Sequence, residues 1–131
     1  MKLEAYGNQA ALIGRILFAL CFLGFGYEKI VMFGFGGLTG YMAAQGLPVP
    51  GLFAFLADVI EVGGAVLILI GYQTRLVALG FAIYVIVAAL IAHHDWSNLQ
   101  NLSDFLKNLA IAGGALAFVA YGSGTTSVDR K

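Results

Sequence analysis

Four long apolar stretches are the feature that most constrains what this chain can fold into. They cover residues 10–32, 52–72, 76–92 and 105–121. Each is close to the roughly 17–25 residues that a helix needs to cross a bilayer. Since backbone N–H and C=O groups in lipid need internal partners, and these stretches lack the alternating pattern of barrel strands, they predict helices. We expect a single all-α domain over residues 1–131, an integral membrane four-helix bundle.

The composition excludes several other classes of protein. Hydrophobic residues make up 60% of the chain and charged residues only 11%, so whole stretches lack the polar face that a soluble helix would show. The net charge is zero, with seven basic and seven acidic side chains, which gives no basic surface for nucleic acid. The single cysteine, Cys21, excludes an intrachain disulfide and a CxxC redox pair.

The connections between the stretches predict how the bundle is oriented. Only residues 73–75 separate the second stretch from the third, which makes these helices antiparallel neighbours. Residues 33–51 form a longer, glycine-rich connection, in which residues 41–45 are expected to form one interfacial helical turn. The side of the membrane that holds both termini carries most of the basic residues, namely Lys2, Arg15, Arg75, Arg130 and Lys131, against Lys29 and Lys107 on the other. By the positive-inside rule the termini are cytoplasmic and residues 33–51 face outward.

Ionisable side chains inside the stretches are the candidates for function. Inserting a central Asp, Lys or Arg costs roughly 2.5–3.5 kcal/mol, so such groups usually face the bundle interior and have partners. Arg15 lies near the cytoplasmic end of the first helix, where its long side chain is expected to reach the headgroups. Its charge also favours a retained first helix over a cleaved secretory signal. A ligand-binding site or buried polar network is predicted in the outer half, at Glu28, Lys29, Asp58, Glu61, His93, Lys107 and Asn108.

A buried ion pair between Glu61 and Lys107 is predicted at the centre of this network. At about 1.5 Å of rise per residue, Glu61 lies deepest among the outer-half charges and Lys107 lies near its level. Gly63 and Gly64 follow Glu61 and let a neighbouring helix approach. A stripe of small residues on the fourth helix suits the same contact, formed by Ala110, Gly113, Ala117 and Ala120. The alternative is a purely structural network that fixes the helix register.

His93 and His94 are the candidate metal or haem ligands in this sequence. Neighbouring side chains diverge by about 100° around a helix, and the chain has no HxxxH or HxxE spacing. A bis-histidine haem needs one histidine from each of two facing helices, whereas both lie on the same one. We therefore expect no metal site and no covalently bound cofactor. The pair is interpreted as an interfacial titrating group near Asp95 and Trp96.

Short motifs in a fixed order run along nearly the whole chain. They are R-x-L-x-A-L from residue 15, G-x-x-K at 26–29, Y-M-A-A-Q-G-L-P-V-P at 41–50, E-V-G-G at 61–64, T-R at 74–75, H-x-x-W at 93–96, F-L-K-N-L-A at 105–110 and S-V-D at 127–129. Together they resemble the DoxX family of small bacterial membrane proteins. The resemblance implies a four-helix protein of the bacterial inner membrane, with characteristic polar positions at Glu61, Arg75, His93, Lys107 and Asn108. It also implies kinship with a thiosulfate:quinone oxidoreductase subunit and with membrane redox complexes that handle oxidative or thiol stress.

The resemblance favours a membrane subunit or anchor of a quinone-linked redox system. A quinone is then the candidate cofactor, and a redox protein or a homo-oligomer is the candidate partner. Glu61 is expected to be the proton-active carboxylate with Lys107 as its counter-ion, while Phe53, Phe55 and Tyr84 line an apolar ring site. In an enzyme the chain would be a non-catalytic or quinone-binding subunit of an oxidoreductase complex, because it has no redox cofactor motif of its own. Two other classes stay open: proton-coupled small-solute transport, and a purely structural membrane partner.

The predicted orientation can be tested with a fused reporter. Alkaline phosphatase placed after Lys131 is expected to be inactive, because the charge bias keeps that end of the chain in the cytoplasm. Phosphatase activity of whole cells measures this. Periplasmic activity of the fusion would overturn the orientation.

Overall fold

The chain forms four membrane-length helical segments, with no strand among the residues described. The structure is a computed structural model that describes residues 2–130, apart from the side chains of residues 32, 33 and 35. Lys131, counted above among the basic residues, lies outside the described residues. The four segments, each long and apolar enough to span a bilayer, are Leu3–Val31, Pro50–Ile70, Thr74–Ala92 and Leu99–Tyr121. The predicted all-α, four-helix membrane architecture is therefore confirmed.

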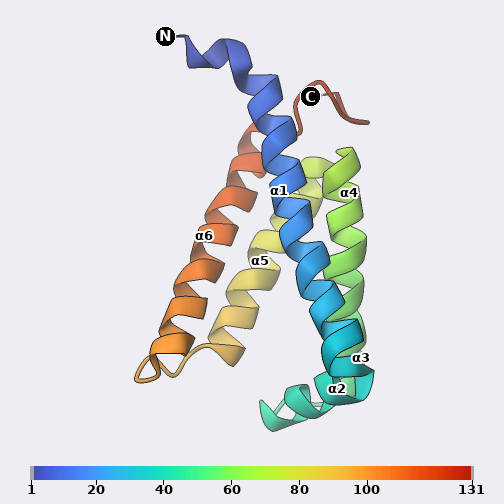
Figure 1. The fold of residues 1–131 in the computed structure, drawn as a ribbon, viewed down its shortest axis with the longest axis vertical. Helices are drawn as coiled ribbons and strands as arrows, with labels where there is room; N and C mark the ends of the chain where they lie inside the picture. The colour runs from blue at the N-terminus through green and yellow to red at the C-terminus, as the bar shows by residue number, and fades with distance from the viewer. Residues whose placement is uncertain (1, 131) are drawn as a thin grey trace.

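The segments divide into shorter elements and pack as two pairs. In chain order the elements are the 3-10 turn η1 (Leu3–Tyr6), α1 (Gly7–Tyr27), the π-helical η2 (Glu28–Phe33), α2 (Gly34–Ala44), α3 (Pro50–Asp58), the π-helical η3 (Val59–Gly63), α4 (Gly64–Ile70), α5 (Thr74–Ala92) and α6 (Leu99–Tyr121). Helix α1 packs chiefly on α4 and η3, and α6 packs chiefly on α5 (Figure 1). Both chain ends and the α4–α5 turn lie at one end of the bundle, here called the tail end, and α2 lies at the other, the loop end (Figure 1).

The connection at the loop end is largely a helix. Helix α2 covers Gly34–Ala44, where the glycine-rich sequence predicted an irregular connection with a single turn at residues 41–45. Packing outweighs the weak helix propensity of glycine here, because Leu38 is buried. Gly34 has φ 72°, so the chain changes direction as α2 begins. Pro50 then occupies the first turn of α3, a position that suits proline.

Helix α6 begins earlier than the apolar pattern predicted. It starts at Leu99 rather than at residue 105, so its first two turns are polar. The side chain of Asn98 accepts hydrogen bonds from the backbone N–H groups of Gln100 (2.9 Å) and Asn101 (3.3 Å). This is an N-terminal cap, which fixes the start of the helix independently of hydrophobicity.

Small residues and two phenylalanine rings form the core. Phe22 of α1 and Phe81 of α5 lie with their ring centroids 4.3 Å apart. Five buried alanines, drawn from all four spans, let the helices approach: Ala19, Ala65, Ala78, Ala112 and Ala115. The stripe predicted to join the second and fourth spans is exposed, as at Gly113 and Ala117. That predicted contact is wrong, because α6 turns the neighbouring positions Ala112 and Ala115 toward the core and packs on α5.

Arg15 is buried in the bundle, with 0% of its surface exposed. Its guanidinium donates from Nε to the carbonyl of Ser123 (3.0 Å), from Nη1 to those of Leu69 (2.7 Å) and Ile68 (3.3 Å), and from Nη2 to that of Thr126. The expectation that Arg15 reaches the headgroups is wrong. The backbone brings enough acceptors to the guanidinium to offset its removal from water.

Residues 122–130, which we call the tail, continue this contact network beyond α6. The backbone N–H of Asp129 donates to the carbonyl of Gly71 (2.9 Å). Its carboxylate accepts from the backbone N–H groups of Gln73 (2.9 Å) and Thr74 (2.8 Å), at the start of α5. Gly71 has φ 73°, and a Cβ there would lie 2.3 Å from Cβ of Ser127, so only glycine fits this turn. The tail therefore ties α1, α4, α5 and α6 together.

Replacing Arg15 with methionine is expected to release the tail. The variant leaves buried carbonyls without a donor, which should lower the free energy of unfolding by about 3 kcal/mol. Thermal unfolding in mild detergent measures the loss, and faster carboxypeptidase digestion of residues 122–130 reports release of the tail.

Arg130→Met is the matched control, because Arg130 is an exposed arginine in the same tail. It should change the stability by less than about 0.5 kcal/mol. Equal stability and equal digestion of the two variants would contradict the role assigned to Arg15.

Candidate functional site

A buried carboxylate in the loop-end half of the bundle is the centre of the candidate site. Glu61 is only 2% exposed. Nζ of Lys29 lies 3.0 Å from Oε1 of Glu61, and the hydroxyl of Tyr84 donates a 2.5 Å hydrogen bond to the same oxygen. The ammonium of Lys29 also lies 5.4 Å from the centre of the Phe25 ring. Three spans thus supply one cluster: Lys29, Glu61 and Tyr84.

Two π-helical segments carry the charged members of this cluster. Lys29 lies in η2 and Glu61 lies in η3. A π-helical segment accommodates an extra residue within a helix and is frequent at functional sites. Here the two segments belong to adjacent spans, since η3 packs against α1. The ion pair therefore joins the places where both helices depart from α-helical geometry.

Two buried carboxylate oxygens near this cluster have no hydrogen-bond partner among the described residues. They are Oε2 of Glu61 and Oδ1 of Asp58, which precedes Glu61 by one turn. Buried polar atoms in folded proteins nearly always have a partner, because an unpartnered one costs free energy. The free oxygen of Glu61 is thus an acceptor that the fold itself does not satisfy.

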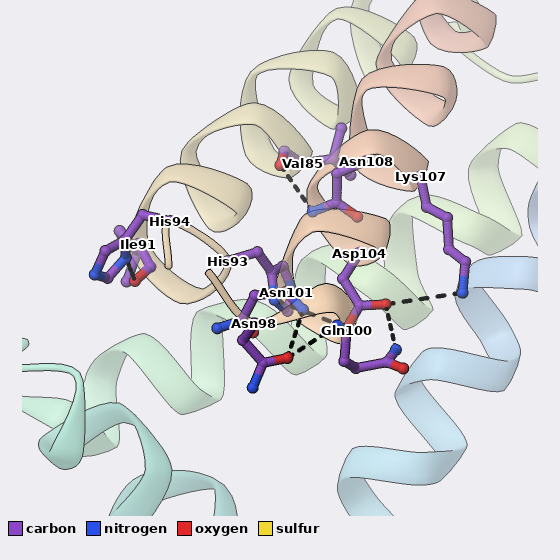
Figure 2. Close-up of polar contacts among 10 residues, drawn as sticks. All are labelled: Val85, Ile91, His93, His94, Asn98, Gln100, Asn101, Asp104, Lys107 and Asn108. Atoms are coloured by element: carbon purple, nitrogen blue, oxygen red, sulfur yellow. Dashed lines mark hydrogen bonds and ion pairs between the residues drawn. The ribbon is translucent and has the colours of Figure 1, made fainter. Parts of the chain in front are cut away.

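A second polar group joins α5 and α6 nearer the loop end (Figure 2). Nδ1 of His93 lies 3.9 Å from Oδ2 of Asp104, and Nζ of Lys107 lies 3.8 Å from Oδ1. Gln100 donates to Oδ1 of Asp104 at 3.0 Å, which completes a cluster around this carboxylate. Tyr41 of α2 lies within its electrostatic reach: partial burial and the charge of Asp104 raise the pKa of the phenol, which stays protonated.

The structure separates the predicted outer-half residues into two groups. Glu61 pairs with Lys29, and Asp58 precedes Glu61 by one turn. Lys107 instead contacts Asp104, with 70% of its side chain exposed. The predicted Glu61–Lys107 pair is therefore replaced by Glu61–Lys29, because α1 packs against η3 while α6 packs on α5.

The remaining predicted residues lie outside the cluster of Lys29, Glu61 and Tyr84. Glu28 is exposed. Asn108 donates to the carbonyl of Val85 at 3.0 Å, a contact that holds α6 on α5 (Figure 2). Nδ1 of His94 lies 2.9 Å from the carbonyl of Ile91, away from His93. Within residues 2–130 no three His, Cys, Asp or Glu side chains gather as a metal site would require.

Two residues of these clusters have roles that the sequence did not predict. Tyr84 was expected to line a ring site with Phe53 and Phe55, but its hydroxyl bonds Glu61, and the two phenylalanines are 38% and 57% exposed. Asp104 was not among the predicted site residues. The contact of Tyr84 with Glu61 could have been predicted, because a buried tyrosine hydroxyl usually forms a hydrogen bond, and Glu61 was expected at a similar depth.

Two surface hollows lie away from the polar clusters. One, of about 180 Å³, is at the tail end beside Thr74, Arg75 and Asp129. The other, of about 210 Å³, lies between the second span and α5 and is apolar, lined by Ile60, Gly64, Val77, Gly80 and Phe81.

Comparison with known proteins gives one family and close relatives. The family model for DoxX matches residues 10–94, a segment that contains Lys29, Glu61 and Tyr84. The inner membrane protein YphA of Escherichia coli strain K12 is 42% identical over 125 residues, which cover 92% of this chain and 88% of YphA. The inner membrane protein YqjF of the same strain is 38% identical over 129 residues, 98% of this chain and 94% of YqjF. No solved structure matches the chain.

The pairing of Glu61 with Lys29 predicts a strong coupling between two substitutions. Lys29→Met leaves a buried carboxylate without its cation and should destabilise the protein by about 3–5 kcal/mol. In the double variant Lys29→Met with Glu61→Gln most of that loss should be recovered, because no unpaired charge remains. Thermal unfolding in mild detergent measures all four proteins of the cycle.

Lys107→Met serves as the control, since the Lys107 side chain is 70% exposed. It should change the stability by less than about 0.5 kcal/mol, with or without Glu61→Gln. A coupling of Glu61 to Lys107 as large as that to Lys29 would refute the assignment.

Proposed function

The chain belongs to the DoxX family and is a multi-pass inner-membrane protein, and from that premise we propose that it is the membrane subunit or anchor of a quinone-linked redox system. The observation that carries the proposal is the buried carboxylate of Glu61, one oxygen of which has no partner within the described part of the chain, while the other contacts Lys29 and Tyr84. Ionisable groups buried within membrane spans commonly mark proton or substrate sites.

This arrangement suits the proton chemistry of a quinol. Oxidation of a quinol releases two protons and two electrons. Oε2 of Glu61 can accept a hydrogen bond from a quinol hydroxyl and then its proton, while Lys29 and Tyr84 hold Oε1. Once that proton has passed to water, the same carboxylate can accept the second one. Burial keeps the proton from exchanging freely with water, and the ammonium of Lys29 balances the carboxylate charge.

The electrons need an acceptor that this chain does not carry in its sequence. It has one cysteine and no CxxC pair, so the acceptor is placed on a redox partner protein. Helix α6 is the helix least covered by its own bundle, with Gly113 and Ala117 exposed. Small residues permit close helix contacts in membranes, which supports docking of the partner, or of a second copy, on this helix.

The proposal also assigns a side of the membrane to the site. With the tail end in the cytoplasm, the Glu61 cluster lies in the outer half, and protons are released toward the periplasm. The basic residues Lys2, Arg75 and Arg130 at the tail end support this orientation.

Mass spectrometry of the protein purified in mild detergent tests the proposal. A quinol is expected to copurify in near-stoichiometric amount, detected together with the quinone that air oxidation forms from it. Glu61→Gln should reduce this bound pool roughly tenfold, because the hydrogen bond from a quinol hydroxyl to a charged acceptor contributes about 1.5–3 kcal/mol. Lys107→Met should bind as much quinone as the wild type.

The same experiment has outcomes that count against the proposal. If no quinone copurifies, and deletion of the protein leaves quinol-linked sulfur or thiol oxidation unchanged in cells, the redox role fails. Solute flux into proteoliposomes that depends on Glu61 would instead support proton-coupled transport. A stoichiometric protein partner without any bound small molecule would support a structural role.

A further inference from the structure

The hollow at the tail end lies where α5 begins and α6 ends, and charged groups line it. Its lining comes from the first turn of α5, from Gly122 and Ser123 after α6, and from Asp129 of the tail. Its volume is about 180 Å³, and a cavity of about 150 Å³ is enough to bind benzene. The hollow therefore has room for a group of similar size. Because an arginine and a carboxylate line it, a charged group suits it better than an apolar one.

The hollow lies at the level of the lipid headgroups. Tyr72 precedes α5 and Tyr121 ends α6, and both side chains are exposed. Exposed tyrosines at the ends of membrane spans are typical of the membrane–water interface. Leu76 also lines the hollow and is exposed at the start of an apolar span. The hollow therefore borders the hydrocarbon on the side of Leu76.

The first turn of α5 presents hydrogen-bond donors at this hollow. The N–H of Val77 donates to the residue before the helix, so the four N–H groups that precede it have no acceptor within the helix. Asp129 accepts from the first two, which leaves those of Arg75 and Leu76. The Arg75 guanidinium donates from Nη1 to two carbonyls at the end of α6, and its other donors have no partner among residues 2–130. A phosphate suits this group of donors.

A buried hydroxyl is a second, independent indication of a ligand. Thr74 lines the hollow and is 1% exposed, yet its Oγ1 has no hydrogen-bond partner within the described part of the chain. Buried hydroxyls in folded proteins nearly always have a partner, because an unpartnered one costs free energy. Rotation about the Cα–Cβ bond exchanges Oγ1 with the methyl group. The hydroxyl can therefore turn and donate to a phosphate that enters the hollow.

The lining also carries a negative group. The two oxygens of the Asp129 carboxylate each accept one backbone N–H, at 2.9 and 2.8 Å, and a carboxylate offers about four lone-pair sites. The carboxylate can therefore accept from an ammonium as well. Arg75 and Asp129 place charges of opposite sign on one hollow. A headgroup that holds both a phosphate and an ammonium complements both charges, whereas a purely anionic one leaves Asp129 facing a like charge.

We propose that this hollow binds the headgroup of phosphatidylethanolamine from the leaflet on the tail side, with the phosphate at Thr74 and Arg75 and the ammonium at Asp129. The acyl chains of the lipid then extend into the bilayer past Leu76. The bound headgroup adds contacts between α5 and the tail. This site lies at the opposite end of the bundle from Glu61 and does not depend on the redox role proposed above.

Native mass spectrometry of the full-length protein in mild detergent tests this assignment. Protein freed of lipid is titrated with dioleoyl phosphatidylethanolamine, with dioleoyl phosphatidylglycerol, or with dioleoyl phosphatidylcholine, whose ammonium is trimethylated. The first lipid should bind roughly tenfold more tightly than the other two, because only its ammonium can donate hydrogen bonds to Asp129. This comparison uses the wild type, so it decides the result whether or not a variant folds.

Thr74→Val tests the position of the phosphate, because it removes the hydroxyl and keeps the shape of the side chain. The hydroxyl has no partner among the described residues, so the variant should be at least as stable as the wild type in lipid-free detergent. Its affinity for phosphatidylethanolamine should fall roughly tenfold. Thr39→Val is the matched control, because Oγ1 of Thr39 is also buried without a partner in the described chain but lies in α2 at the loop end. It should bind the lipid as the wild type does.

Three results would overturn the proposed site. Equal affinity for the three lipids excludes recognition of the ammonium. An affinity for phosphatidylethanolamine that is the same in Thr74→Val and in the wild type places the lipid elsewhere. Displacement of the lipid by an equal concentration of phosphoethanolamine, which is the same headgroup without acyl chains, makes the hollow a site for a soluble molecule.

Discussion

The buried guanidinium of Arg15 is the interaction on which the packing of the tail end depends. A charge with no exposed surface is stable inside an apolar bundle only when its donors are satisfied. Carbonyls near the end of α4 and in the tail supply the acceptors, at Leu69 and Ser123 among others. One side chain of α1 therefore holds the end of the second span and the tail that follows α6. Asp129 of the tail in turn binds the start of α5.

The loop-end half of the bundle is held by a different kind of contact. There, the charged side chains bond chiefly to one another. Oε1 of Glu61 has two partners, whereas Oε2 has no partner among the residues that the structure describes. The helices that carry Lys29 and Glu61 both become π-helical at this level. The tail end is therefore closed by satisfied hydrogen bonds, whereas the Glu61 cluster keeps buried polar atoms that the described residues do not satisfy.

The sequence predicted the parts of this structure that depend on composition and depth, and missed those that depend on helix neighbours. The length of the apolar stretches predicted the four spans and therefore both termini at one end of the bundle. The order of the motifs predicted the family, which is confirmed. Depth along the spans favoured Lys107 as the partner of Glu61, but the partner is Lys29, because α1 packs against η3 while α6 packs on α5. Arg15 was misplaced for a related reason, because its acceptors are backbone carbonyls, which no residue type signals in a sequence.

The distance along the chain between Arg15 and its acceptors has a consequence for biosynthesis. Arg15 and Ser123 are separated by 108 positions, so the first span is made and delivered to the membrane long before its guanidinium can be satisfied. Until residues 123–126 have been synthesised, Arg15 remains a charged group in need of water or headgroups, and the first helix has reason to stay near the membrane surface or against the insertion machinery. The arginine thus couples final burial of the first helix to synthesis of the last, and an interrupted chain would keep an exposed charge by which quality-control proteases could distinguish it.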